Sequence, residues 1–216
     1  MEDIAIIGAG GFGREVATTI LHNNLNKSSW NLVGFYDDGI ATGTSISHYG
    51  KVLGGIHSIN QISKPLNVVI AIGNPSTRAK IRKIINTPLV SFPNIIYDNI
   101  IRCADTNTLK IGQGNIIQAG CWASCDVSIG DFNVFNGETN LGHDVEIGDY
   151  NVIMPGVWIS GEVKIGNENL IGVSSVILQR LKIGNNVHLG AGAVLLTRPK
   201  DGCTYIGNPA KLFRYK

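Results

Sequence analysis

A histidine beside a carboxylate could do acid–base chemistry in the C-terminal half of the chain. His143 and Asp144 end the run Asn140-Leu141-Gly142-His143-Asp144. An imidazole titrates near neutral pH, and a neighbouring negative charge stabilises its protonated form, so the pair could act as a general base. A surface His-Asp pair without any chemical role is the alternative.

A glycine-rich loop near the N-terminus could hold a phosphate. Gly8, Gly10 and Gly13 fit G-x-G-x-x-G between an apolar run and a helix-compatible run. Bare backbone N–H groups at the start of a helix can face an anion. Asp37 and Asp38 close a second apolar run, where a carboxylate commonly accepts ribose hydroxyls. We expect a nucleoside diphosphate carrying a sugar; NAD and a turn that only packs helix on strand are the alternatives.

The candidate base lies in a repeat that must position it. Ile-Gly recurs every 18 residues, and every sixth residue from Ile111 to Leu195 is apolar. A helix would spread this six-residue period around its surface, whereas short strands joined at corners keep it on one side. We therefore predict a three-sided parallel β-solenoid over 94–198, in about five or six coils. Residues 97–108 are expected to form a less regular first coil.

The N-terminal half has a different pattern, in which strands alternate with helices. The predicted strands cover 3–7, 32–36 and 67–72, and the predicted helices cover 14–22 and about 77–85, with Pro75-Ser76 as a helix start. Alternation of this kind predicts a small Rossmann-like parallel sheet with helices on its faces. The predicted domains are therefore 1–93, 94–198 and a C-terminal tail, 199–216.

Histidine and cysteine spacing argues against a metal site. His143 and His188, the histidines of the repeat, are not separated by a multiple of 18 residues, so we place them on different sides of the solenoid. His188 has no carboxylate neighbour and is interpreted as structural. Cys103, Cys121 and Cys125, with Cys203, form no C-x-x-C pair. We expect reduced, partly buried thiols and no bound metal.

Composition excludes other partners. The 216 residues carry a formal charge of +2, too little for an electrostatic grip on nucleic acid or an anionic membrane. No apolar run approaches the ~20 residues that span a bilayer, and the first residues lack the basic region of a signal peptide. We expect a cytoplasmic protein.

The combination of these features resembles a known family. The Ile-Gly coils, the Gly142-His143-Asp144 corner, the segment 207–211 (Gly-Asn-Pro-Ala-Lys) and the N-terminal glycine loop occur together in this order. Together they resemble the hexapeptide-repeat sugar O- and N-acyltransferases of the left-handed β-helix superfamily. The likeness is closest to the nucleotide-linked amino-sugar N-acetyltransferases of the bacillosamine and perosamine type, with sialic acid O-acetyltransferases as relatives.

The resemblance implies a homotrimer that takes acetyl-CoA as co-substrate in the groove between neighbouring left-handed solenoids. His143 would take a proton from the sugar amine, with Asp144 raising its basicity. Two further sets of residues follow from the resemblance. The nucleotide-linked sugar would be held by Gly10, Gly11, Phe12, Asp37, Asp38 and Gly73, and the pantetheine tunnel would be lined by Gly161, Val173 and Ala191.

The sequence departs from the family at two positions. Val152 stands where many relatives have a second histidine, and Phe12 stands where some have a histidine in the glycine loop. Acetyl transfer to the amine of a nucleotide-activated deoxysugar is the leading hypothesis. O-acetylation of a sugar hydroxyl, as in sialic acid modification, is the nearest competitor, and a non-catalytic trimer that binds a nucleotide-sugar or NAD is the competitor from another class.

Overall fold

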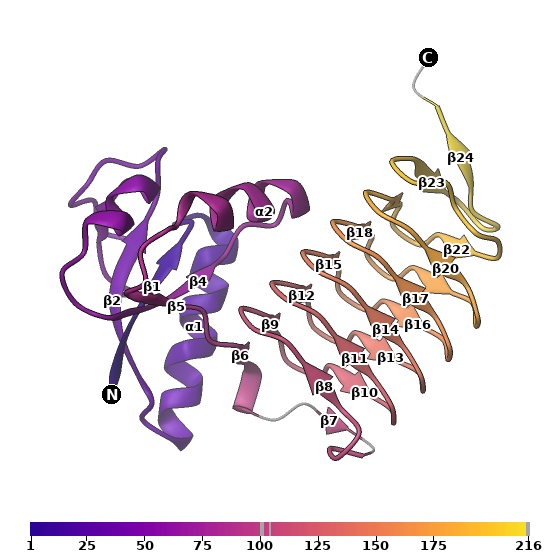
Figure 1. Ribbon diagram of the computed structural model, residues 1–216, viewed down its shortest axis with the longest axis horizontal. Coiled ribbons are helices and arrows are strands. Elements are labelled where there is room, and N and C mark those ends of the chain that lie inside the picture. Colours follow the sequence, from indigo (N-terminus) through magenta and orange to yellow (C-terminus); the bar gives the residue numbers. More distant parts are fainter. Residues whose placement is uncertain (100–101, 104, 215–216) are drawn as a thin grey trace. The chain divides into compact units, whose positions relative to one another are not determined.

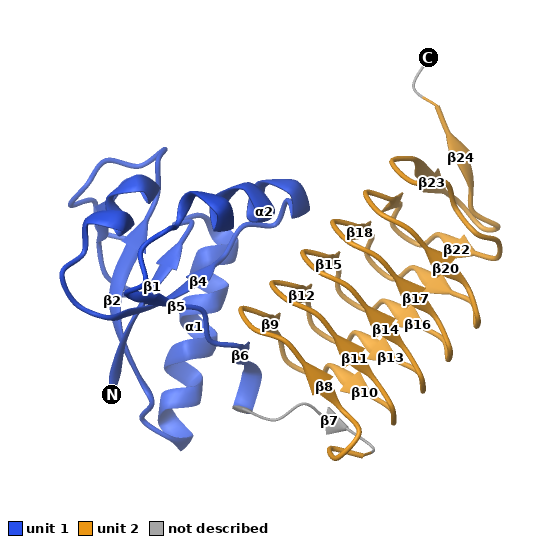
Figure 2. Cartoon of the chain, viewed as in Figure 1, with its two compact units in different colours: residues 1–99 blue, residues 100–216 orange. Residues whose placement is uncertain are grey.

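The computed structural model describes residues 1–99, 102–103 and 105–214, without the side chains of Asn99, Arg102 and Cys103. The chain forms two compact units, 1–99 and 100–216 (Figure 2). The boundary predicted from the sequence was Pro93, before the last elements of unit 1. The expected irregular first coil, 97–108, includes positions 100, 101 and 104, which lie outside the described residues.

Unit 1 is a five-stranded sheet in the order β3-β2-β1-β4-β5, with all its neighbours parallel. The predicted strand–helix alternation is confirmed, although β3, β5 and the 3-10 helices were not predicted. The elements are β1 (Glu2–Ile7), α1 (Gly11–Asn26), β2 (Trp30–Tyr36), β3 (Val52–Gly54), η1 (Ile56–Gln61), β4 (Leu66–Ile70), α2 (Pro75–Ile84), β5 (Val90–Ser91), β6 (Ile95–Ile96) and η2 (Tyr97–Asn99). Buried aliphatic residues of β1, β4 and α1 form the core.

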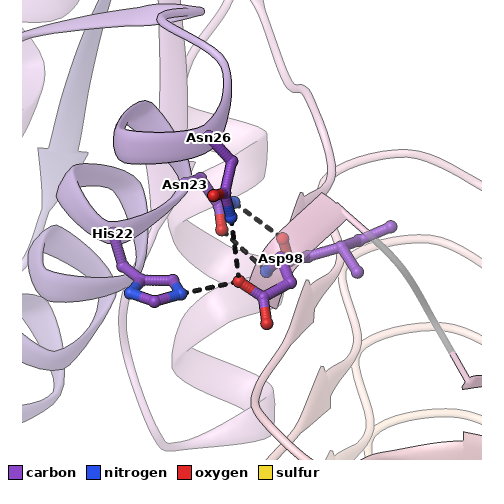
Figure 3. Close-up of polar contacts among 5 residues, drawn as sticks. His22, Asn23, Asn26 and Asp98 are labelled. Atoms are coloured by element: carbon purple, nitrogen blue, oxygen red, sulfur yellow. Dashed lines mark hydrogen bonds and ion pairs between the residues drawn. The ribbon is translucent and has the colours of Figure 1, made fainter.

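The last residues of unit 1 are fixed to α1 by a polar cluster (Figure 3). Asn23 is only 2% exposed; its Nδ2 donates to Ile96 O and its Oδ1 accepts from Asp98 N, both at 2.7 Å. His22 Nε2 lies 2.6 Å from the Asp98 carboxylate, which also accepts a longer bond from Asn26. These contacts explain why unit 1 continues beyond the Pro93 boundary.

Unit 2 consists of very short strands stacked coil on coil, in three parallel sheets (Figure 1). We name two of its faces by their outward side chains. The tryptophan face contains β7 (Arg102–Cys103), β10 (Trp122–Ala123), β13 (Asn140–Leu141), β16 (Trp158–Ile159), β19 (Val176–Ile177) and β22 (Val194–Leu195). The charged face contains β8 (Lys110–Ile111), β11 (Ser128–Ile129), β14 (Glu146–Ile147), β17 (Lys164–Ile165) and β20 (Lys182–Ile183).

The third face completes each coil. It contains β9 (Ile116–Ile117), β12 (Val134–Phe135), β15 (Val152–Ile153), β18 (Leu170–Ile171) and β21 (His188–Leu189), then β23 (Thr204–Ile206) and the antiparallel β24 (Lys211–Phe213). Within the segment expected as a C-terminal tail, β23 pairs with β21 and β24 pairs with β23. His188 lies on this face, apart from the corner that holds His143, as the spacing predicted.

The interior of unit 2 matches the two predicted inward columns. The six-residue column is buried at most of its positions, and the residues two positions earlier are buried as well. One corner carries a ladder of fully buried asparagines whose side chains bond at intervals of 18 residues, Asn115, Asn133, Asn151 and Asn169. Each also donates to a backbone carbonyl in the next coil, so these buried amides are hydrogen-bonded.

No helix among the described residues is long and apolar enough to cross a membrane.

Candidate functional site

His143 and Asp144 occupy the corner between β13 and β14. Asp144 has a left-handed backbone (φ 58°), and its N–H donates to Cys125 O at 3.1 Å. In this conformation the Asp144 carboxylate lies beside the preceding residue, His143, with Oδ2 at 2.7 Å from His143 Nδ1. The side chains are 55% and 57% exposed. Because Nδ1 is engaged by the carboxylate, Nε2 is the nitrogen available to a substrate.

The same corner recurs in the preceding coil and in the two following coils, and we call this column the His143 edge. It consists of Cys125-Asp126, His143-Asp144, Gly161-Glu162 and Gln179-Arg180. The second residue of each pair is left-handed. In the last three pairs its N–H donates to a carbonyl of the previous coil, as Glu162 N does to His143 O at 2.8 Å, whereas Asp126 N donates to Thr108 Oγ1 at 2.8 Å. The backbone that carries His143 is therefore fixed from both sides.

The residues expected to line the pantetheine tunnel lie at two different edges. Gly161 belongs to the His143 edge and follows His143 by one coil. Val173 and Ala191 lie in the corners that lead into β19 and β22, and we call this column the Val173 edge. The tryptophan face separates the two edges, so one chain does not bring these three residues together.

The tryptophan face was not recognised from the sequence. Trp122 and Trp158 are 39% and 59% exposed, and both stand in register with Asn140 between them. Val173 of the Val173 edge and Leu178, directly before Gln179 of the His143 edge, are also exposed. The sequence did contain a signal for this face: Trp122 and Trp158 each stand directly before a residue of the inward six-residue column, so both should point outward. Exposed aromatic side chains between two candidate edges are typical of a surface that another protein covers.

The charged face carries a groove of about 770 Å³ beside the His143 edge. Asp144 lines it, together with residues of both signs: Lys110, Glu146, Lys164 and Lys182. Lys164 Nζ is 2.6 Å from Glu146 Oε1, and Arg180 Nε is 2.9 Å from Glu162 Oε1. Within each ion pair the positive and negative charges partly offset each other. The charged face is thus polar, whereas the tryptophan face presents exposed apolar side chains.

Val152, which replaces a histidine of many relatives, lies on β15 in the third face and is 1% exposed. It pairs in register with Val134 and Leu170. Within one chain it is therefore not a neighbour of His143, and its side chain belongs to a packed column.

The glycine loop of unit 1 lies at the carboxyl end of β1. Because β2 and β4 flank β1, the loops after β1 and β4 diverge there, which is where open α/β sheets bind ligands. Gly8 adopts φ +97°, and a side chain on Gly13 would overlap Gly8 O, so two glycines of the motif are required by the turn and the close approach.

Three predicted ligand-binding glycines have a different environment. A Cβ added at Gly10, Gly11 or Gly73 would meet no atom within 4 Å. Packing within the chain therefore does not require glycine there, whereas close approach of a ligand to the backbone would. Phe12, in the first turn of α1, is half-buried.

The two helix N-termini differ in their capping. Asn74 caps α2, because its Oδ1 accepts from Thr77 N at 2.9 Å. Gly10 at the start of α1 supplies no side-chain cap. An anion could accept from the N-terminus of α1 in place of a side-chain cap, and this role of the loop stays a prediction.

Asp37 and Asp38 bond to backbone N–H groups. Asp37 Oδ2 accepts from Ala9 N and Oδ1 from Gly39 N, both at 2.8 Å. Asp38 Oδ1 accepts from Ile56 N at 2.7 Å. Asp37 therefore ties the glycine loop to the end of β2, a role that the sequence did not indicate. Binding of ribose by these carboxylates stays a prediction.

Cys121 is buried and Cys125 and Cys203 are partly buried free thiols; the side chain of Cys103 lies outside the described residues. Burial raises the pKa of the Cys121 thiol, against a smaller lowering by hydrogen bonds with Thr139. Among the described residues, no three His, Cys, Asp or Glu side chains gather in a way that could hold a metal ion.

Comparisons with known proteins agree with this architecture. Residues 3–85 match the PglD N-terminal domain family, and residues 162–197 match the bacterial transferase hexapeptide family. A search of curated protein sequences gives no match.

Solved structures match nearly the whole chain. The acetyltransferase domain of PglB from Neisseria gonorrhoeae FA1090, in complex with acetyl coenzyme A, is 29% identical with a TM-score of 0.85, covering 98% of this chain and 99% of that one. WeeI from Acinetobacter baumannii AYE is 28% identical with a TM-score of 0.86, covering 99% and 100%.

PerB from Caulobacter crescentus, in complex with CoA and GDP-perosamine, shares the fold at 23% identity, a TM-score of 0.82 and coverage of 99% and 98%. These matches confirm the predicted fold class, a Rossmann-like unit followed by a hexapeptide β-helix. The chain thus combines a match to the PglD N-terminal domain family, a match to the bacterial transferase hexapeptide family, and similarity over nearly its whole length to the acetyltransferase domain of PglB.

Proposed function

We propose that this protein transfers an acetyl group from acetyl-CoA to the amino group of a nucleotide-activated amino-deoxysugar. The observation that carries the proposal is the His143–Asp144 pair, bonded at 2.7 Å on an exposed edge of the β-helix with Nε2 available. The acetyltransferase domain of PglB, to which this chain is similar over nearly its whole length, was solved in complex with acetyl coenzyme A. A cytoplasmic location, where acetyl-CoA is available, is part of this proposal.

His143 acts as the general base in this proposal. Nε2 takes a proton from the neutral sugar amine while the amine nitrogen attacks the thioester carbonyl, forming the C–N bond. The C–S bond then breaks, and the imidazolium returns the proton to the departing CoA sulfur. Asp144 stabilises the imidazolium and holds the ring through Nδ1.

The proposed active form is a homotrimer. The tryptophan face lies between the His143 edge and the Val173 edge. Packing of this face against a second copy would bring the His143 edge of one chain to the Val173 edge of its neighbour. Gly161 and the pair Val173 and Ala191 could then line one pantetheine tunnel, which a single chain does not form.

Unit 1 supplies the nucleotide-sugar site in this proposal. The diphosphate would lie at the uncapped N-terminus of α1, against Gly10 and Gly11, with Gly73 on the neighbouring loop. Phe12 offers an apolar surface beside it, and Asp38, which is exposed, is the candidate for the ribose hydroxyls.

An acceptor panel tests the proposal. The protein is incubated with acetyl-CoA and UDP-, GDP-, dTDP- or CMP-linked sugars, each in an amino and a hydroxyl form, and free thiol is followed. We expect release with an amino sugar. Release only with hydroxyl sugars would replace the proposal by O-acetylation. No release, together with thermal stabilisation by NAD but not by CoA, would favour a non-catalytic binding protein.

A further inference from the structure

The His143 ring lies against the residue one coil further along its edge. A Cβ built on Gly161 would stand 2.5 Å from His143 Nε2, 2.7 Å from Cε1 and 2.9 Å from Cδ2. These distances are shorter than real Cβ contacts allow, and all three atoms belong to the imidazole. The ring therefore occupies the space that any side chain at position 161 would need.

This contact differs from the close approaches at Gly166 and Gly142, where backbone atoms are among the nearest. A Cβ at Gly166 would meet the backbone of Gly184, and one at Gly142 would meet the backbone around Gly161. Substitution at those positions would shift the main chain. At Gly161 the nearest atoms are the end of an exposed side chain, which can rotate away without moving the coil.

We propose that Gly161 is a positioning residue, whose missing side chain lets the His143 imidazole lie along the edge with Nδ1 on Asp144 and Nε2 open. This inference rests on the proposed role of His143. The ring is held on one side by the Asp144 carboxylate at 2.7 Å. On the other side, only a glycine at position 161 leaves room for the ring. A methyl group there would push the ring away and break the bond between Nδ1 and the Asp144 carboxylate.

The Gly161→Ala variant tests the inference, with Gln179→Ala as the matched control one coil further along the same edge. A crystal structure of Gly161→Ala should show the imidazole displaced and the Nδ1–Asp144 bond broken. This readout does not depend on any substrate. If wild-type protein transfers no acetyl group, the proposed function fails while the position of the ring still tests this contact.

Kinetics then separate positioning from other roles. With an acceptor from the panel, Gly161→Ala should lower kcat ~10–100-fold, because small misplacements of a reacting group are costly. Because Gly161 is also proposed to line the pantetheine tunnel, kcat is measured at saturating acetyl-CoA, and a rise in KM for acetyl-CoA without a fall in kcat would overturn the positioning role. Gln179→Ala should retain wild-type kcat.

The decisive comparison uses a variant without the imidazole. In a His143→Ala background the ring is gone, so adding Gly161→Ala should change neither the residual kcat at saturating acetyl-CoA nor Tm by a measurable amount. A further loss of activity or of Tm in the double variant would overturn the inference. So would an unmoved ring in Gly161→Ala, or an unchanged kcat.

Discussion

At the scale of residues, the candidate chemistry depends on one corner of one coil. Asp144 is left-handed, and this conformation turns its carboxylate back onto the preceding imidazole. The pair was recognisable in the sequence because histidine and aspartate are adjacent. The contact with Gly161 was not recognisable, since it depends on which way the ring lies relative to the next coil.

Replacing Asp144 by Asn should lower kcat less than removing His143 does. The amide oxygen can still accept from Nδ1, but it carries no charge to stabilise the imidazolium. We expect a loss of ~10-fold, smaller than the ~10²–10⁴-fold contribution of a general base, because the pair is exposed to solvent. Steady-state kcat at saturating acetyl-CoA measures it; a loss equal to that of His143→Ala would contradict this division of roles.

Cys121 should resist alkylation. The thiolate is the reactive form, and burial raises the pKa of this thiol, so less of it ionises at neutral pH and reactivity grows only at higher pH. Peptide mass spectrometry after brief N-ethylmaleimide treatment at pH 7 should find Cys125 and Cys203 modified before Cys121. Equal labelling of all three in folded protein would argue against the buried position.

At the scale of elements, the coils of unit 2 are tied together by side chains that bond across one repeat. The asparagine ladder is the buried example, and an outer ladder through Asp131, Asp149 and Asn167 bonds backbone N–H groups at the surface. The two ladders have the same spacing of 18 residues but differ in exposure. Exposure should therefore decide how much each contributes to stability.

Asn151→Ala should destabilise the protein far more than Asn167→Ala. Removing the Asn151 amide leaves Asn169 N and Gly166 O without these partners in a buried site, at a cost of ~1–3 kcal/mol for each group. Asn167 is exposed and bonds only Asp149 N among these groups, so water can replace it. Denaturant unfolding compares the two variants, and equal losses would contradict the exposure argument.

The elements also show how far the sequence could predict the fold. The apolar residue at every sixth position was sufficient to predict the β-helix, because one inward-facing residue of each short strand must be apolar and recurs at that spacing. The helix α1 is longer than predicted, Gly11–Asn26, since its glycines and its polar C-terminal turn hide the helical pattern. The strands β3 and β5 are too short to give a pattern, and the capping role of Asn74 depends on the bend before α2.

At the scale of the whole molecule, the candidate site residues lie at two edges of unit 2. Sequence spacing placed Val173 and Ala191 in one column, but it did not reveal that the tryptophan face separates them from Gly161. Nor did it identify Trp122 and Trp158 as exposed. An interface is formed by outward-facing side chains. The repeat restricts only the inward-facing residues, so it does not predict the interface.

Trp158→Glu should dissociate the proposed trimer, because it places a charge in the centre of the apolar face. Leu25→Glu is the control, since Leu25 is an exposed apolar residue of unit 1, 82% accessible. Light scattering coupled to size exclusion should give a monomer for Trp158→Glu and a trimer for the control. A trimer with Trp158→Glu would place the interface elsewhere.

The central claim is that the His143 imidazole is the base of an acetyl transfer. Turnover of His143→Ala, measured by thiol release at saturating acetyl-CoA with the preferred amino sugar from the panel, tests it most directly. We predict a fall in kcat of ~10²–10⁴-fold with the trimer and its Tm retained. Turnover equal to that of the wild-type protein would contradict the claim.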